Sequence, residues 1–221
     1  MLLSRRCPGC RAPARSVCDR CRSHLVRHRP TADQLAPLIE HTGVSGLVAL
    51  WPYDPCSRAV ILALKNGHRP DLAAVAARAL ASRIPAVDVV TWVPASGRGR
   101  RRRGYDQGAV LAGRLAHRLG VPRRRLLVRV DTAGGRTRSR AERLGGPAIE
   151  PVRGVGAGPR PLGRVLLVDD VVTTGGSLAS SARALRAAGA GEVRAAVLAV
   201  VDPAVAPRCG RGGLGLGSGA L

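Results

Sequence analysis

Residues 165–178 read VLLVDDVVTTGGSL, and this stretch decides the fold. The four apolar residues 165–168 predict a fully buried strand, as in a parallel sheet covered on both faces. Two carboxylates, a small polar loop and an Ala/Leu-rich helix at 178–188 follow: Asp169, Asp170, then Thr173, Thr174, Gly175, Gly176 and Ser177. Amides at a loop and helix start bind a phosphate dianion, and paired carboxylates accept hydrogen bonds from vicinal hydroxyls. The stretch therefore predicts a site for a phosphorylated sugar.

The rest of the chain alternates between strand and helix patterns. Strands are predicted at 44–50, 87–93, 126–130 and 193–201, and helices at 57–66, 71–83 and 105–119. A short connecting helix is expected within 24–41, and a long polar loop at 131–147. This alternation predicts an α/β fold with a parallel, doubly wound sheet. We expect a cysteine knuckle at 1–25, a connector at 26–44, the α/β domain at 45–206 and a disordered Gly-rich tail at 207–221.

Four cysteines near the N-terminus have the spacing of a metal site. Cys7, Cys10, Cys18 and Cys21 form C-x2-C-x7-C-x2-C, which can place four thiolates around one structural Zn²⁺. Two disulfides do not suit a reducing cytoplasm, and two adjacent pairs outside a βαβ unit do not suit a redox centre. His24 and His28 are alternative ligands, although we expect them at the surface. Cys56 is predicted to be a buried thiol and Cys209 an exposed one.

The chain carries a formal net charge of +22, and all but one of its 36 basic residues are Arg. Residues 98–143 hold 15 Arg against three acids, so +12 of the charge lies in these 46 residues. Such a segment favours polyanionic partners, whether pyrophosphate, nucleotides or nucleic acid. With only Trp51, Tyr53, Trp92 and Tyr105 as aromatics, nucleic acid would be bound through its backbone rather than by stacking.

We expect no targeting signal from the pattern of apolar residues. The apolar stretch at residues 1–4 is too short for a signal peptide, and no segment has the length of a membrane span. We therefore expect a cytoplasmic protein that does not insert into membranes.

A second candidate site follows the predicted strand at 87–93. Residues 94–107 read PASGRGRRRRGYDQ, in which Ala95, Ser96 and Gly97 precede five arginines and a helix start. Open α/β sheets bind ligands at the carboxyl ends of their strands, so this loop predicts a pyrophosphate site. A solvated basic loop is the alternative.

The segment 165–178 resembles the phosphoribosyl pyrophosphate (PRPP) motif of type I phosphoribosyltransferases, a hydrophobic strand followed by D-D-x-x-T-T-G-x-S/T. An ordinary strand, turn and helix is the alternative. A Walker A loop is excluded because the only lysine is Lys65 and no Gly-Lys-Ser/Thr occurs. A Rossmann fingerprint is disfavoured because acidic residues precede the loop where its first Gly would stand.

The order of motifs resembles the ComF family, phosphoribosyltransferase-like proteins associated with DNA uptake in natural competence. The resemblance covers residues 7 to 202: the knuckle, the 53–67 stretch, the RGYDQ segment at 103–107 and the PRPP motif. Three motifs depart from the family pattern, at four positions. Tyr105 and Asp106 replace Phe and Asn, Gly135 replaces a loop Gln, and Gly146 replaces an Asn.

This resemblance implies a ligand, metals and partners. It assigns Asp169 and Asp170 to the ribose hydroxyls, Thr173–Ser177 to the 5′-phosphate, and Ala95–Arg98 with Arg102 or Arg103 to the pyrophosphate. Mg²⁺ would accompany PRPP, bound mainly by ligand oxygens and water. The implied activity is ribosyl transfer to a nitrogen acceptor that the sequence does not name. The alternative is an accessory protein that binds single-stranded DNA alongside competence helicase and uptake proteins.

Overall fold

The main sheet contains four parallel strands. The computed structural model describes residues 6–66, 69–97, 101, 104–130, 147–156 and 161–201. The sheet has the order β1-β6-β5-β2, with every neighbouring pair parallel. Its strands are β1 (Gly46–Pro52), β6 (Ala190–Val200), β5 (Gly163–Val172) and β2 (Val89–Trp92). The predicted α/β fold with a parallel sheet is confirmed.

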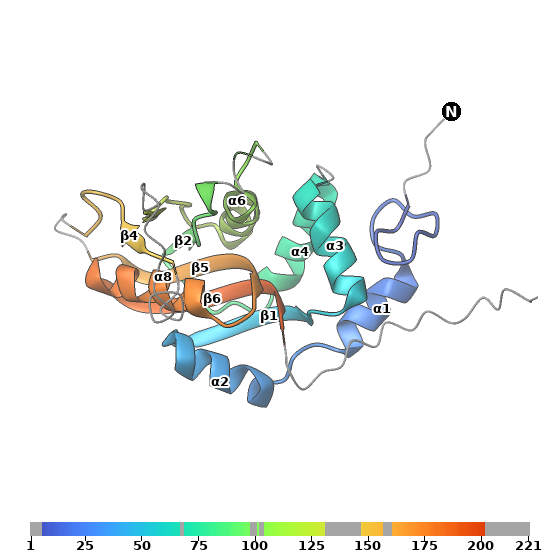
Figure 1. The fold of residues 1–221 in the computed structure, drawn as a ribbon, viewed down its shortest axis with the longest axis horizontal. Coiled ribbons are helices and arrows are strands. Elements are labelled where there is room, and N and C mark those ends of the chain that lie inside the picture. Colours follow the sequence, from blue (N-terminus) through green and yellow to red (C-terminus); the bar gives the residue numbers. More distant parts are fainter. Residues whose placement is uncertain are drawn as a thin grey trace, which may run out of the picture.

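Helices cover both faces of this sheet (Figure 1). On one side lie α1 (Asp19–Arg27), α3 (Pro55–Asn66), α4 (Pro70–Ala81) and α6 (Gln107–Leu119). On the other side lie α2 (Ala32–Thr42) and α8 (Gly176–Ala187). The sheet is thus the middle of three layers, as expected for βα units connected by helices.

The central strand β5 supplies side chains to both halves of the core. Val165 and Leu167 pack toward α8, whereas Leu166 and Val168 pack toward α6 and α4. All four are at most 1% exposed. Successive side chains of a strand point to opposite faces, so a strand covered on both sides must be apolar throughout. This confirms the buried strand predicted from residues 165–168.

The segment predicted as a strand at 126–130 lies outside the main sheet. It forms β3 (Leu127–Arg129), which pairs antiparallel with β4 (Ile149–Pro151), a strand that the sequence did not predict. The chain runs beside β2 only at the bridge between Val90 and Arg123. The Leu126 N–H then donates to the Thr91 hydroxyl, not to a β2 carbonyl, so the backbone ladder with β2 stops there.

Several boundaries also differ from the prediction. The segment 24–41 contains parts of two helices, because Thr31 starts α2 with a capping box closed by Gln34. The predicted loop at 131–147 up to residue 146, the tail at 207–221 and Cys209 lie outside the described residues. Within the described ranges, no helix has both the length and the apolar character needed to cross a membrane.

Candidate functional site

The acidic pair lies in the last part of β5. The strand does not stop at residue 168 as predicted: it continues through both carboxylates to Val172, because β6 still pairs with Asp169 at Val197. The Asp169 Oδ1 atom accepts a hydrogen bond of 2.8 Å from the Asp170 N–H. Both side chains are half-buried. The pair is therefore held on a rigid element at the carboxyl end of the sheet.

Lys65 at the end of α3 reaches this pair. Its Nζ atom lies 2.8 Å from Asp170 Oδ2, and the two side chains are only 26% and 20% exposed. No sequence motif placed Lys65 in the site. A signal was present, however: this is the single lysine among 36 basic residues.

The electrostatics of the pair favour a proton or a hydrogen-bond donor. Burial, followed by the charge on Asp170, raises the pKa of Asp169 to about 8. The Asp170 N–H and Lys65 act in the opposite direction, and the carboxylate of Asp106 adds to the rise. Two carboxylates this close repel each other when both are ionised in a partly buried site. Hydroxyl groups of a ligand, or a cation, would reduce this repulsion.

The loop after β5 leads directly into α8. This helix begins at Gly176, two residues before the predicted start, and its N-cap Gly175 has a φ of +79° and no capping side chain. A Cβ at Gly175 would stand 2.8 Å from Thr42 Cγ2, so only glycine fits beneath α2. Thr173 and Thr174 are exposed, and Ser177 is half-buried in the first turn. The loop thus offers the N–H groups of a helix start together with three hydroxyls.

The loop after β2 begins beside the last part of β5, because Trp92 pairs with Val168 and the Val93 N–H donates to the Val168 carbonyl. A cavity of about 320 Å³ adjoins this loop, lined by Trp92, Pro94, Ala95, Gly97, Asp106, Arg125, Val128 and Arg129. Ala95 and Gly97, whose role in binding pyrophosphate remains a prediction, line this cavity, and Ser96 lies between them in sequence. Arg98, Arg102 and Arg103 lie outside the described residues.

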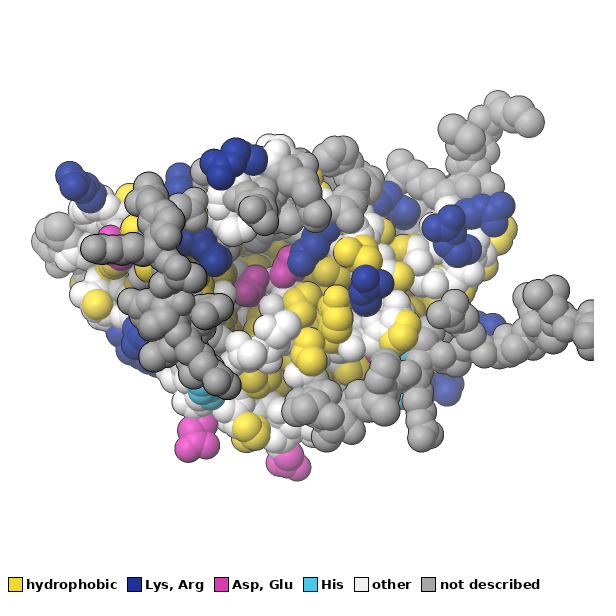
Figure 2. All heavy atoms as spheres, viewed as in Figure 1, with side chains coloured by type: hydrophobic (Ala, Val, Ile, Leu, Met, Phe, Trp, Pro, Cys, Tyr) yellow, Lys and Arg dark blue, Asp and Glu magenta, His cyan; other side chains and the backbone are white. Residues whose placement is uncertain are grey.

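Three further side chains at this cavity were not predicted. Asp106 accepts hydrogen bonds from the Trp92 indole (3.1 Å) and the Ala95 N–H (3.4 Å), and it also caps α6. Arg125 and Arg129 bring positive charge to the lining. Figure 2 shows acidic side chains near the middle of the face in view, with basic and hydrophobic ones around them. The local composition suits a ligand that carries both hydroxyls and phosphates.

Residues 106–208 match the phosphoribosyl transferase domain. The acidic pair and the 173–177 loop lie within the matched segment, whereas Lys65 and the cysteines precede it. The match supports phosphoribosyl transfer at the general level of the domain. No curated protein matches the chain.

Solved structures of phosphoribosyltransferases are among those similar to this chain. Glutamine PRPP amidotransferase from B. subtilis, in complex with ADP and GMP, is 26% identical, with a TM-score of 0.42. The similarity covers 62% of this chain and 30% of that one, so the chain spans less than a third of that protein. Orotate phosphoribosyltransferase from Aeropyrum pernix is 24% identical over 75% of this chain and 81% of its own, with a TM-score of 0.37.

The four N-terminal cysteines form a cluster that fits a metal ion. Their Sγ atoms all lie within 4.8 Å of one another, and those of Cys10 and Cys18 are 3.4 Å apart. Burial acts to raise the pKa of Cys7, but N–H groups of Cys10, Cys18 and Gly9 bring it down to about 7. Burial and then the neighbouring thiols raise the pKa of Cys21. Four sulfur donors at this separation suit tetrahedral Zn²⁺, whose charge favours the thiolates.

The two histidines near this cluster, His24 and His28, contact other groups than the cysteines. His24 Nε2 lies 2.7 Å from the buried Asp54 carboxylate, which also accepts from the Ser57 N–H at the start of α3. His24 is therefore a link between α1 and the core, and not the surface residue that we expected. His28 contacts the His24 ring and backbone. Cys56 is buried as predicted.

Proposed function

We propose that this protein binds Mg²⁺–PRPP and transfers the phosphoribosyl group to a nitrogen acceptor. The observation that carries the proposal is the half-buried pair of Asp169 and Asp170 near the end of β5, with the glycine-capped start of α8 after the short loop that follows. The match of residues 106–208 to the phosphoribosyl transferase domain supports the same reading.

Each part of PRPP has chemically matched groups. Asp169 and Asp170 would accept hydrogen bonds from the ribose hydroxyls, and the amides and hydroxyls of 173–177 would hold the 5′-phosphate. Ala95, Ser96 and Gly97, with Arg98 and Arg102 or Arg103, would bind the pyrophosphate, with charge added by Arg125 and Arg129. Mg²⁺ would be coordinated mainly by oxygens of the ligand and by water, and when bound it would neutralise charge on the pyrophosphate.

The reaction needs positioning more than a protein nucleophile. The acceptor nitrogen bonds to C1 of the ribose while the C1–O bond to pyrophosphate breaks, and the bonding electrons leave with pyrophosphate. The proton on the nitrogen goes to solvent. Positive charge develops at the ribose carbon, so the charge on Asp170 and arginines on the leaving group would both stabilise the transition state.

A melting curve with millimolar Mg²⁺ and PRPP tests the site. Binding to the folded state alone should raise Tm, and the Asp169→Asn, Asp170→Asn double variant should lose this rise while remaining folded. Asp88→Asn, which removes an exposed acid at the opposite end of β5, is the matched control and should keep the rise. An unaltered protein whose Tm does not respond to PRPP or ribose 5-phosphate would refute the proposal.

A second candidate follows from the resemblance to ComF: an accessory role in DNA uptake, in the cytoplasm with competence helicase and uptake proteins. Arg123, Arg124 and Arg125 are exposed in succession, within the basic segment 98–143. Such arginines bind phosphates with a steep dependence on salt. Replacing Arg100–Arg103 by Ser should weaken binding to all single-stranded DNA sequences equally; no binding at low salt would remove this candidate.

A further inference from the structure

The four cysteines of the cluster are not equally accessible. Cys10 is exposed and Cys18 is half-buried, whereas Cys7 and Cys21 are only 0% and 6% exposed. Each Cys-x-x-Cys pair therefore contributes one outer thiol, Cys10 or Cys18, and one inner thiol, Cys7 or Cys21. Oxidation of a cysteine depends on its exposure, so the outer thiols are the ones that a small oxidant in solution can reach.

The two outer thiols are also close together. Their Sγ atoms are 3.4 Å apart, although they belong to different Cys-x-x-Cys pairs. A disulfide bond requires the two sulfurs to approach to about 2.0 Å, which is a small movement for side chains at the surface. Sequence spacing alone would join Cys7 to Cys10 and Cys18 to Cys21. Exposure and distance instead favour a bond between the outer thiols.

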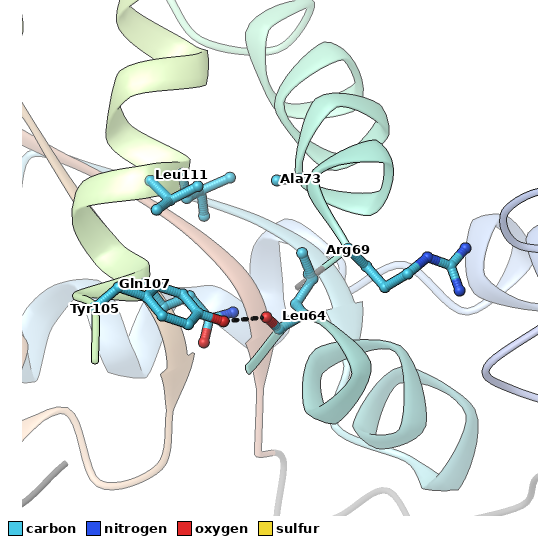
Figure 3. Close-up of a pocket in the computed structure, with 7 residues that line it drawn as sticks. Leu64, Arg69, Ala73, Tyr105, Gln107 and Leu111 are labelled. Atoms are coloured by element: carbon cyan, nitrogen blue, oxygen red, sulfur yellow. Dashed lines mark hydrogen bonds between the residues drawn. The ribbon is translucent and has the colours of Figure 1, made fainter. Parts of the chain in front are cut away.

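Contacts that do not involve a metal ion hold the cluster segment in shape. The Cys7 N–H donates to the Ala12 carbonyl (2.8 Å), which closes the first turn. The stretch between the two pairs is fastened to α4, because Nη2 of Arg69 donates to the Arg15 carbonyl (3.0 Å). Figure 3 shows the Arg69 side chain directed away from the apolar cavity between α3, α4 and α6. The outer thiols would therefore stay near each other if the metal ion left.

A fifth thiol, Cys56 at the start of α3, lies on the inner side of the cluster. A Cβ at Gly9 would stand 2.9 Å from Cys21 Sγ and 3.0 Å from Cys56 Sγ, so the two sulfurs border the same small space. Cys21 and Cys56 are thus a second possible disulfide pair. Cys56 is only 1% exposed, however, and both residues belong to the core. Buried thiols of this kind are inert while their surroundings stay packed.

We propose that the cysteine cluster is a peroxide-sensitive site, in which oxidation joins Cys10 to Cys18 and releases the metal ion. The Cys10 thiolate attacks hydrogen peroxide: an S–O bond forms, the O–O bond breaks and hydroxide leaves. The Cys18 thiolate then attacks Cys10 Sγ: the S–S bond forms, the S–O bond breaks and a second hydroxide leaves. Two thiolates lose two electrons in total, and one peroxide becomes two hydroxides that solvent protonates to water.

The disulfide would leave only the two inner thiolates as ligands, too few for the four-coordinate site that Zn²⁺ prefers. The opening would remain local, because the inner thiols pack in the same core as Leu25, Val60 and Ile61. Such a site differs from a catalytic redox pair, since its thiols are metal ligands in the reduced protein. The inference is independent of the proposed phosphoribosyl transfer.

Treatment of the zinc-loaded protein with increasing amounts of hydrogen peroxide tests this inference. A Cys209→Ser background leaves Cys56 as the only cysteine outside the cluster. Released Zn²⁺ is followed with a chromophoric chelator, and the remaining thiols are then alkylated for peptide mapping by mass spectrometry. We expect about one Zn²⁺ to be released for each disulfide formed. Dithiothreitol with added Zn²⁺ should restore the starting protein.

Peptide mapping identifies the pair. Trypsin cleaves after each arginine between the cysteines, so Cys18 and Cys21 come in different peptides, while Cys7 and Cys10 share one that fragmentation resolves. We expect the disulfide to join Cys10 to Cys18. Any other pairing, or release of zinc without a disulfide, would overturn the inference, as would zinc that is retained in a large excess of peroxide.

The matched control is Cys56→Ala, which removes a thiol that borders the cluster but lies outside the proposed pair. This variant should release zinc at the same peroxide concentration as the parent protein and should form the same disulfide. If Cys56→Ala instead prevents the release of zinc, the reactive pair is Cys21 with Cys56, and the outer thiols do not have the role proposed for them.

Discussion

Replacing Asp169 by Asn should stabilise the protein, and the gain should grow with pH. The folded protein holds the pKa of this carboxyl at about 8, mainly through burial, against 3.8 for an ordinary aspartate. Below the ordinary value both states are protonated and the substitution changes little. As pH rises from 4 to 8, the unfolded chain releases the proton while the folded state keeps it, so stability is lost progressively. Asn mimics the protonated acid and does not suffer this loss.

The shift sets the size of the effect. About four pKa units at 1.36 kcal/mol each give an upper limit of about 6 kcal/mol for a fully dry carboxyl. Part of the Asp169 side chain is accessible to solvent, and Lys65 lies nearby, so the effective cost is smaller. We expect Asp169→Asn to gain about 2 kcal/mol at pH 8 and little at pH 4.

Urea unfolding of both proteins at pH 4, 5, 6, 7 and 8 measures this gain. Asp88→Asn is a control of opposite sign, because hydrogen bonds from Arg164 lower the pKa of Asp88 to about 2. The stabilisation that the Asp88 carboxylate gains from Arg164 is complete above pH 4 and is lost only in stronger acid. Asp88→Asn should therefore lower the free energy of unfolding by the same amount at every pH between 5 and 8. An Asp169→Asn effect that is destabilising, or equal at pH 5 and 8, would show that the carboxylate is already stabilised in the folded state.

Three further predictions concern other parts of the site. Cys18→Ser should bind less zinc than the one ion per chain expected of the unaltered protein, as measured by elemental analysis. It should unfold only the cysteine cluster, seen as faster hydrogen exchange in that segment, and a full zinc content would exclude the tetrathiolate site. Gly175→Ala should cost about 2–4 kcal/mol in urea unfolding and weaken phosphate binding, since its Cβ would clash with α2, whereas Gly189→Ala, at a φ of +83° in open space, should cost only about 1 kcal/mol. Lys65→Met should cost about 1–2 kcal/mol at pH 8 but nothing when Asp170→Asn is also present; an equal cost in both backgrounds would contradict the pairing.

Patterns within short segments were readable before the structure. The apolar run 165–168 predicts a two-sided buried strand because side-chain direction alternates within one strand, and β5 confirms it. The C-x2-C-x7-C-x2-C spacing predicts converging thiols because each turn brings two sulfurs together, and their Sγ atoms do converge. The ligand-binding roles of Asp169, Asp170 and the 173–177 loop remain predictions, although the sequence did predict that this loop leads into the start of a helix.

The tertiary structure alone decided the contacts between distant segments. Lys65 and Asp170 are far apart in sequence, and no local pattern joins them. Gln107 looked like part of an anion-binding helix start, but α3 and α4 enclose it in an apolar cavity. The segment 126–130 has the composition of a strand, but its sequence does not show which strand it pairs with. In the structure the Leu126 N–H donates to the Thr91 hydroxyl, and the strand pairs with β4 rather than with β2. Local sequence fixes dihedral preference and which face is apolar, whereas pairings between distant segments depend on how the packed layers bring them together.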